Sequence, residues 1–396
     1  MNTTLPIESF GILSGSPRFD TVLEGDQAYL PAPERYESAF RDIFTRQYYT
    51  NQGPLASRLE ERLRAFHGVR HAVCVTNATI GLIMAAEAMG LHGRVIVPAL
   101  ASVSVLQSLT WAGLEPLFSD VDPRTHQIDA DYAADLLNQG HSDIAAILAV
   151  NQWGSVCDTA ALRDLAHQFE VRLYFDSVHA FANIVNGAPI GGQGDIEVFS
   201  LHSGQIMGGA EGSYLCTNDD SLAGRLRNIR SSYGAGIPVT VSKTSNGRLS
   251  EAQAALGLMH LDDFPRLQSA NTKLFQRYES GLRSILGIRL LKPSGIDSSN
   301  YAYLICEIDE SEFGMSRDCL VSVLKADNVN ARHLMSFETA MTCPTSVTHL
   351  PRAAQIMRNH LQLPLGPDVS TQDVDRVCTL IAAAKIHATA LAKASS

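Results

Sequence analysis

The sequence predicts an α/β protein with a mostly parallel sheet, followed along the chain by a smaller α+β domain. Between positions 71 and 230, short runs of apolar and β-branched residues alternate with helical runs. The run at 144–150 is apolar throughout, as expected for a strand that helices cover on both faces. After about position 261 the alternation ends. Ligands of such sheets bind beyond the carboxyl ends of the strands.

Seven strands account for the alternation in the first part of the chain. They are expected at 71–76, 95–98, 117–119, 144–150, 171–175, 196–200 and 213–216. Between them, the run at 79–89 has small and apolar residues nearly all round, which predicts a buried helix. Further helices are expected from about position 104 and at 160–169.

The remaining chain predicts a smaller domain of mixed composition. A helix at 252–261 is expected before this domain, and within it helices are expected at 270–284, 316–327 and 374–388 and a strand at 301–308. A boundary near 262–265 gives three parts. These are an N-terminal segment at 1–40, a large domain at 41–264 and a small domain at 265–396.

The bulk properties exclude several classes of function. The net charge of -10 and the scattered basic residues argue against a nucleic-acid partner. Seven cysteines without a CxxC pair predict neither a metal site nor a disulfide framework, and they suit a reducing cytoplasm. The first 19 residues do not resemble a signal peptide, and no apolar run approaches the ~20 residues of a membrane helix.

A candidate phosphate-binding site lies at the strand-to-helix turn formed by Asn77, Ala78 and Thr79. Backbone N–H groups at a helix N-terminus, together with the Thr79 hydroxyl, attract anions. Ser200, at the end of a later strand, has a hydroxyl that can donate to a phosphate oxygen. The alternative for the turn is an ordinary helix N-cap without a ligand.

Asp176 and His179 follow a buried strand at the edge where a ligand is expected. A carboxylate there can pair with a protonated pyridine nitrogen, as in sites for pyridoxal 5′-phosphate (PLP). His179 can hydrogen-bond a phenolic oxygen of the cofactor or act as a base. The alternatives are an acid that caps the next turn and a histidine that bonds a backbone carbonyl.

In their order along one chain, these residues resemble the DegT-type (DegT/StrS) family of PLP-dependent sugar aminotransferases, a branch of fold-type I. The resemblance runs from about position 49 to the C-terminal helix. The segments that carry it are Thr50-Asn51-Gln52-Gly53-Pro54, Asn77-Ala78-Thr79, Asp176-Ser177-Val178-His179, Phe199-Ser200 through Gly212, Asn246-Gly247-Arg248 and Leu363-Pro364-Leu365.

The resemblance implies a role for each matched residue. Asp176 would pair with the pyridine nitrogen, His179 would lie by the phenolic oxygen, and Ala78, Thr79 and Ser200 would hold the phosphate. Asn246 would reach the phosphate of a neighbouring subunit, since these enzymes are usually homodimers with shared sites. The cofactor would be PLP or its amine form, pyridoxamine 5′-phosphate (PMP). The substrate would be a keto sugar, expected to be nucleotide-linked, and glutamate would be the amino donor.

Two departures from the family pattern matter. Gln205 falls on the family's Schiff-base lysine. Its amide nitrogen is not nucleophilic and does not shuttle protons, so transamination should nearly cease. Ser102 falls where the family usually has an aromatic residue that stacks on the pyridine ring, so this stacking is lost.

Three explanations for Gln205 stand at this point. It is an engineered substitution in a true aminotransferase, or a natural residue that supports other PMP chemistry such as sugar dehydration, or the mark of a non-catalytic ligand-binding homologue. In the second case His179 or His202 would supply the missing basic nitrogen. The leading hypothesis is an aminotransferase in a lysine-deficient form.

Overall fold

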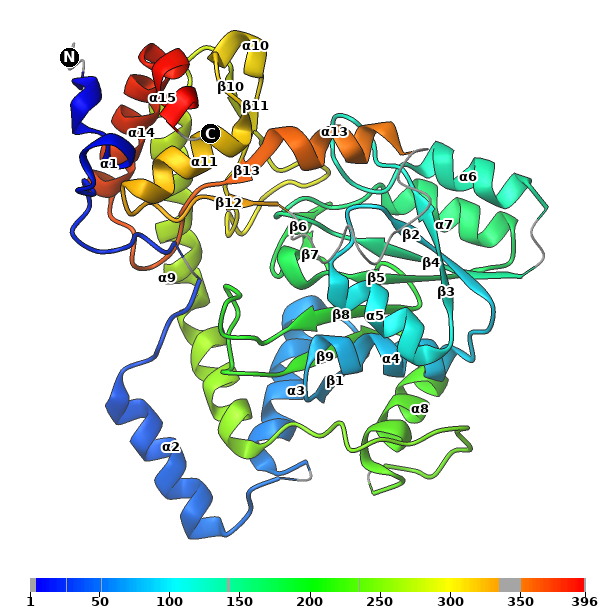
Figure 1. Cartoon of the computed structure of the whole chain (residues 1–396). Helices are drawn as coiled ribbons and strands as arrows, with labels where there is room; N and C mark the ends of the chain where they lie inside the picture. Colours follow the sequence, from blue (N-terminus) through cyan, green and yellow to red (C-terminus); the bar gives the residue numbers. More distant parts are fainter. Residues whose placement is uncertain are drawn as a thin grey trace.

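The chain folds into a larger part around a seven-stranded sheet and a smaller part around a four-stranded sheet (Figure 1). The computed structural model describes residues 5–25, 27–50, 52–140, 143–234, 236–334 and 350–394.

The large sheet is mostly parallel, which confirms the predicted fold class. Its strand order is β1-β9-β8-β5-β4-β2-β3, and only the two pairs that include β9 are antiparallel. The strands are β1 (His71–Val75), β2 (Arg94–Pro98), β3 (Glu115–Ser119), β4 (Ile144–Val150), β5 (Arg172–Asp176), β8 (Ile196–Ser200) and β9 (Ser213–Thr217).

Helices cover both faces of this sheet. Val95 and Val97 pack with the helices of one face and Ile96 packs with those of the other, because alternate side chains of a strand point to opposite sides. The first face is covered by α4 (Ala78–Met89), α5 (Val103–Ala112) and α8 (Asp220–Ser231). The second face is covered by α3 (Pro54–His67), α6 (Ala130–Asn138), α7 (Thr159–Gln168) and α9 (Glu251–Leu282).

The smaller part has an antiparallel sheet in the order β10-β11-β13-β12. Its strands are β10 (Ile288–Leu290), β11 (Ile305–Ile308), β12 (Arg332–His333) and β13 (His360–Gln362). Its helices are α10 (Glu310–Phe313), α11 (Arg317–Ala326), α13 (Pro351–Asn359), α14 (Thr371–Ile386) and α15 (Ala388–Ala394). Phe10, Phe19 and Leu23 from the N-terminus belong to the same hydrophobic core.

Short elements complete the described chain. They are η1 (Ile7–Ser9), α1 (Gly11–Ser14), α2 (Pro33–Arg46), η2 (Val178–Ala180), β6 (Ile184–Val185) and β7 (Ala188–Pro189). Within the described residues no single helix is both long and apolar enough to span a bilayer, although the pair α14 and α15, bent by 94°, meets that test when taken together.

The helices expected separately at 252–261 and 270–284 form one helix, α9, which runs through Pro265. A proline inside a helix removes one backbone hydrogen bond. The helix continues because its first half packs in the core of the larger part, around Leu258 and Phe264, and its second half in the core of the smaller part, around Phe275. The three-part division at 40 and 264 stays a prediction.

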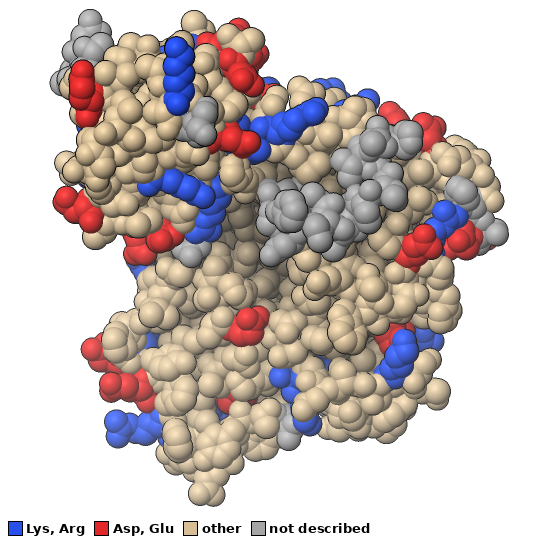
Figure 2. All heavy atoms as spheres, in the orientation of Figure 1, with Lys and Arg blue, Asp and Glu red and all other residues tan. Residues whose placement is uncertain are grey.

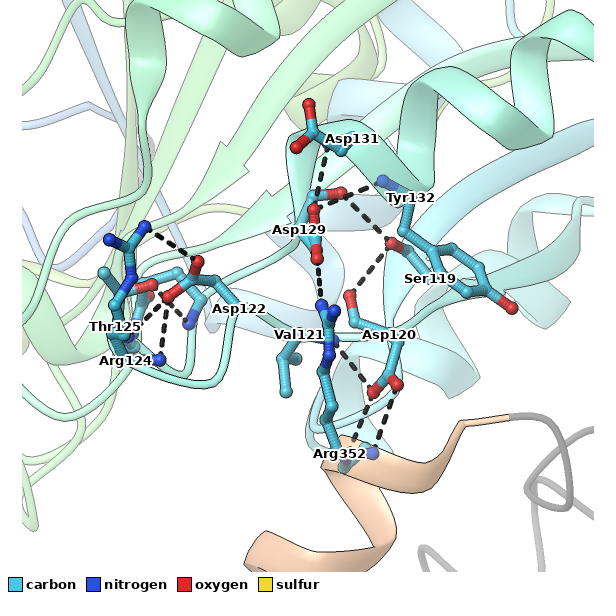
Figure 3. A network of polar contacts seen from close by, with 12 residues as sticks. Ser119, Asp120, Val121, Asp122, Arg124, Thr125, Asp129, Asp131, Tyr132 and Arg352 are labelled. Carbon is cyan, nitrogen blue, oxygen red and sulfur yellow. Dashed lines mark hydrogen bonds and ion pairs between the residues drawn. The ribbon is translucent and has the colours of Figure 1, made fainter.

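Helix α13 is fixed to the larger part by Asp120, which follows β3 (Figure 3). The N-cap residue of α13, Leu350, has no side chain that can accept a hydrogen bond. The Asp120 carboxylate accepts instead from the backbone N–H groups of Arg352 at 3.2 Å and Ala353 at 2.9 Å. The Arg352 guanidinium also pairs with Asp129. A side chain more than 200 residues away in the sequence therefore caps this helix.

We predict that Asp120→Ala lowers the free energy of unfolding by about 1–3 kcal/mol, because the buried N–H of Ala353 and the partly buried N–H of Arg352 lose their acceptor. Thermal unfolding followed by circular dichroism measures the change. The control is Asp131→Ala, which removes an exposed carboxylate from the same region and should change stability by less than about 0.5 kcal/mol. Equal effects of the two substitutions would contradict the assigned cap.

Candidate active site

A cavity of about 770 Å³ lies at the carboxyl ends of the parallel strands. Figure 2 shows the molecule hollowed between its larger and smaller parts. Because the strands β1, β2, β4, β5 and β8 end at this edge, the residues that follow them converge on the cavity. Its lining includes Ala78, Thr79, Ser102, Asp176, His179, Ser200 and Gln205. The structure thus brings together every predicted site residue except Asn246, and their roles stay predictions.

The first turn of α4 presents backbone donors at one end of the cavity. Asn77 is the N-cap, and its side chain accepts from the N–H of Ile80 at 2.9 Å. The first intrahelical hydrogen bond runs from Gly81 to the Asn77 carbonyl. The amides of Ala78 and Thr79 therefore precede the hydrogen-bonded helix, and they are free to donate to an anion. The N-cap and the phosphate-binding site are compatible readings of this turn.

Asp176 ends β5 and is buried, with 6% of its surface exposed. Its carboxylate accepts one backbone hydrogen bond, from Val178 at 3.0 Å. Desolvation raises the pKa of this carboxyl to about 6, although the hydrogen bond from Val178 acts in the opposite direction. A buried carboxylate with so little compensation would gain from a cationic partner in the cavity.

A buried network anchors the chain directly after Asp176. The Ser177 hydroxyl donates to Glu197 at 2.6 Å and accepts from the Asn151 amide at 2.8 Å. Desolvation raises the pKa of Glu197 to about 7, although the hydrogen bonds that its carboxylate accepts lower the pKa. These contacts tie β4, β5 and β8 together, so the network holds the backbone that carries Asp176 and His179.

His179 lies in η2 at the side of the cavity. Burial lowers the pKa of its imidazole to about 4, so the ring is neutral at pH 7. The backbone N–H of Trp153 approaches its Nδ1 at 3.5 Å. This places Nδ1 as an acceptor and the proton on Nε2.

Gln205 is held by the turn that follows β8. The backbone N–H of Gln205 donates to the His202 carbonyl at 2.9 Å, and the backbone N–H of His202 donates to the Ser200 hydroxyl at 3.0 Å. The Gln205 side chain lines the cavity, and its Oε1 accepts a hydrogen bond of 2.7 Å from the hydroxyl of Tyr303. The Tyr303 ring lies 4.3 Å from the His179 ring, measured between centroids.

The charges on the cavity wall are unbalanced. Among the described lining residues, Asp176 and Glu211 carry carboxylates and none is lysine or arginine. Ser102 occupies the position at which the family usually has an aromatic side chain. Its hydroxyl forms a hydrogen bond of 2.9 Å with the hydroxyl of Ser104. Within the described chain, a bound anion would thus meet amide and hydroxyl dipoles rather than a lysine or an arginine.

Asn246 lies outside the cavity of its own chain. It is exposed, and its side-chain oxygen accepts from Arg248 at 2.8 Å. No sequence motif assigned a role to Trp153, Tyr303 or Leu334. Trp153 follows the end of β4, so its position after a parallel strand was a usable signal. Tyr303 and Leu334 come from the smaller part of the chain, and no local pattern marks them.

Comparison with known proteins identifies the family. Residues 33–382 match the model of the DegT/DnrJ/EryC1/StrS aminotransferase family. The chain is 30% identical over 364 residues to a dTDP-4-amino-4,6-dideoxy-D-glucose transaminase of Shigella dysenteriae, covering 90% of this chain and 97% of that protein. It is 25% identical to a GDP-perosamine synthase of Vibrio cholerae, covering 89% and 97% of the two chains.

A solved structure shows the same arrangement of the whole chain. The structure of DesI, determined in the presence of its TDP-sugar product, superposes with a TM-score of 0.92 at 32% identity and covers 98% of this chain and 99% of that one. The fold and the two sets of relatives agree. The chain belongs to the DegT/DnrJ/EryC1/StrS aminotransferase family and is an enzyme of the PLP-dependent aminotransferase type.

Proposed function

We propose that the cavity binds PLP or PMP together with a nucleotide-linked keto sugar, and that Gln205 makes this chain a lysine-deficient form of a sugar aminotransferase. Glutamate is the proposed amino donor. The observation that carries the proposal is the convergence of Ala78, Asp176 and Gln205 on one cavity within a fold that matches a sugar-nucleotide enzyme over 98% of this chain.

The residues present fit the cofactor. The cavity volume of about 770 Å³ is in the range of pockets for small ligands. The α4 N-terminus and the Ser200 hydroxyl suit a phosphate, and the buried Asp176 suits a protonated pyridine nitrogen. When bound, PLP supplies an electron sink and an aldehyde that exchanges with amines. Asp176 would keep its pyridine nitrogen protonated, and His179 would hold the phenolic oxygen.

Gln205 determines what the chain lacks. Its amide does not form a covalent link to the cofactor and does not carry a proton between substrate and cofactor, since its nitrogen lone pair is delocalised. The other residues still bind and orient the ligand. The chain therefore binds cofactor and sugar without efficient turnover.

The wall of a single chain also suggests a homodimer. The described lining has no lysine or arginine to balance a phosphate, and Asn246 is exposed, as a residue that serves a neighbouring subunit must be. We propose that Asn246 of each subunit completes the phosphate site of the other. The location that we propose is the cytoplasm, which suits the free thiols of the described cysteines.

We predict that Gln205→Lys restores glutamate-dependent amination of a nucleotide-linked keto sugar, by at least about 100-fold over the unmodified chain. The restored amine can attach the cofactor and move protons. A shift of PLP absorbance to longer wavelength reports attachment, and mass spectrometry of the sugar reports amination.

Gln205→Arg is the matched control, because it supplies a positive charge but no nucleophilic amine. It should leave the rate near that of the unmodified chain. The aminotransferase proposal would be contradicted if the Gln205→Lys protein held PLP covalently and still aminated none of a panel of keto sugars.

A second candidate is a natural lysine-less enzyme that uses PMP for sugar dehydration. The observation in its favour is the contact between the rings of His179 and Tyr303 beside Gln205, which places two proton-bearing groups near the lysine position. We predict for this case that the chain with Gln205 in place forms a deoxygenated keto sugar with PMP, and that His179→Ala slows product formation by about 100-fold or more. Absence of product from the unmodified chain rules it out.

The raised pKa of Asp176 gives a prediction about pH. The folded-state pKa of about 6 exceeds the ordinary value of 3.8, so ionisation penalises the folded, ligand-free protein as pH rises through that window. Asp176→Asn removes the penalty. We expect it to stabilise the ligand-free protein by about 1–3 kcal/mol at pH 8 and to have no such effect below pH ~4.

The same substitution should weaken cofactor binding, because the pyridine nitrogen loses its carboxylate partner. Thermal unfolding at both pH values, with and without saturating PLP, measures the two effects. Asp164→Asn, at an exposed position of α7, is the control and should change neither. Unchanged stability of the ligand-free Asp176→Asn protein at pH 8 would show that the carboxylate is not strained by burial.

A further inference from the structure

Tyr303 holds the side chain of Gln205 from behind the cavity wall. Tyr303 stands just before β11 in the smaller part of the chain, whereas Gln205 follows β8 in the larger part. Gln205 is among the residues that line the cavity of the candidate site, and Tyr303 instead lines a small neighbouring cavity with Trp153 and His126. The hydroxyl of Tyr303 lies 2.7 Å from Oε1 of Gln205.

This contact fixes which end of the amide faces the ligand. A phenol is a good donor and a weaker acceptor, and the carbonyl oxygen is the accepting end of an amide, so the hydroxyl donates to Oε1. The Tyr303 ring is in turn packed on the His179 ring, with a centroid distance of 4.3 Å. With its oxygen turned toward Tyr303, the amide has its NH₂ group left for the cavity.

An NH₂ group in this position discriminates between ligands by hydrogen-bond complementarity. It donates to an oxygen acceptor on the 4′ carbon of a B6 phosphate, such as the aldehyde oxygen of PLP or a hydroxyl on that carbon. It opposes the amine of PMP, because a primary alkylamine is a protonated donor at neutral pH and two donors do not pair. The Glu211 carboxylate, elsewhere on the cavity wall, would attract that ammonium group, so the effect of Tyr303 has to be isolated by substitution.

We infer that Tyr303 and Gln205 form a selectivity element. It favours a B6 phosphate whose 4′ carbon, next to Gln205, bears an oxygen atom over one whose 4′ carbon bears an ammonium group. Tyr303 acts here as a positioning residue, and Gln205 as the group that touches the ligand. The inference rests on the proposed function in one respect, namely that the cavity binds a B6 phosphate. It adds that the chain prefers the form of the cofactor that bears no amine.

Isothermal titration calorimetry at pH 7.5 with PMP and pyridoxine 5′-phosphate tests the inference. Pyridoxine 5′-phosphate carries a hydroxyl at the relevant carbon and does not form an imine with lysines of the surface. We expect the unmodified chain to bind pyridoxine 5′-phosphate about threefold to tenfold more tightly than PMP, the effect of one hydrogen bond. Tyr303→Phe, which keeps the ring on His179, should reduce this ratio toward one.

Two further variants complete the experiment. Gln205→Glu presents an acceptor to the ligand and should invert the preference in favour of PMP. Tyr301→Phe removes a hydroxyl two residues away, from a ring that packs on Phe275, and should leave the ratio unchanged. Circular dichroism checks that each variant is folded.

The outcomes separate the inference from the function on which it rests. Equal or tighter binding of PMP by the unmodified chain, or a ratio that Tyr303→Phe does not change, overturns the selectivity element while the cofactor site stands. Binding of neither ligand to any variant overturns the proposed function itself.

Discussion

The candidate site depends on one constraint, the convergence of parallel strand ends on a single edge of the sheet. β1, β5 and β8 are far apart in the sequence but end side by side, so the α4 N-terminus, Asp176 and Ser200 reach the same cavity. Helices pack against these strands on both faces of the sheet. The network of Asn151, Ser177 and Glu197 then fixes the backbone at the edge. The groups that we propose to bind a ligand are therefore held in place without it.

The chemistry of the site depends on a second fact, the neutral side chain at position 205. The cavity has carboxylates at Asp176 and Glu211 and no lysine or arginine among its described residues. A lysine would balance this charge and bind the cofactor covalently, whereas the glutamine does neither. The neutral His179, with its low pKa, also adds no positive charge at pH 7. Under the proposed function, the pocket would retain the groups that bind cofactor and sugar and would lack the lysine that moves protons.

Much of the site followed from the sequence because strand ends can be recognised locally. Asp176 stands directly after one predicted strand and Asn77 after another, with Ala78 next to it, and the order of the strands along the chain placed them at one edge. The antiparallel direction of β9 left no mark on its own composition. The continuity of α9 through Pro265 depends on packing against both hydrophobic cores, which local propensity does not report.

The sequence did not predict the contacts between segments that are distant along the chain. Asp120 was a residue after a strand, and nothing near it in the sequence indicated that it caps α13. Tyr303 lies 98 positions from Gln205, and its local sequence predicted only a strand. Such contacts depend on how the smaller part of the chain rests on the larger part, and the hydrophobic pattern of either part alone does not determine this.

The most direct test of the account is borohydride reduction of the chain saturated with PLP, followed by peptide mass spectrometry. The account predicts that the chain binds PLP reversibly, that dialysis removes it, and that no reduced adduct forms on any residue of the cavity wall. A chain that takes up no PLP, or one that acquires a covalent adduct on a cavity residue, would contradict it.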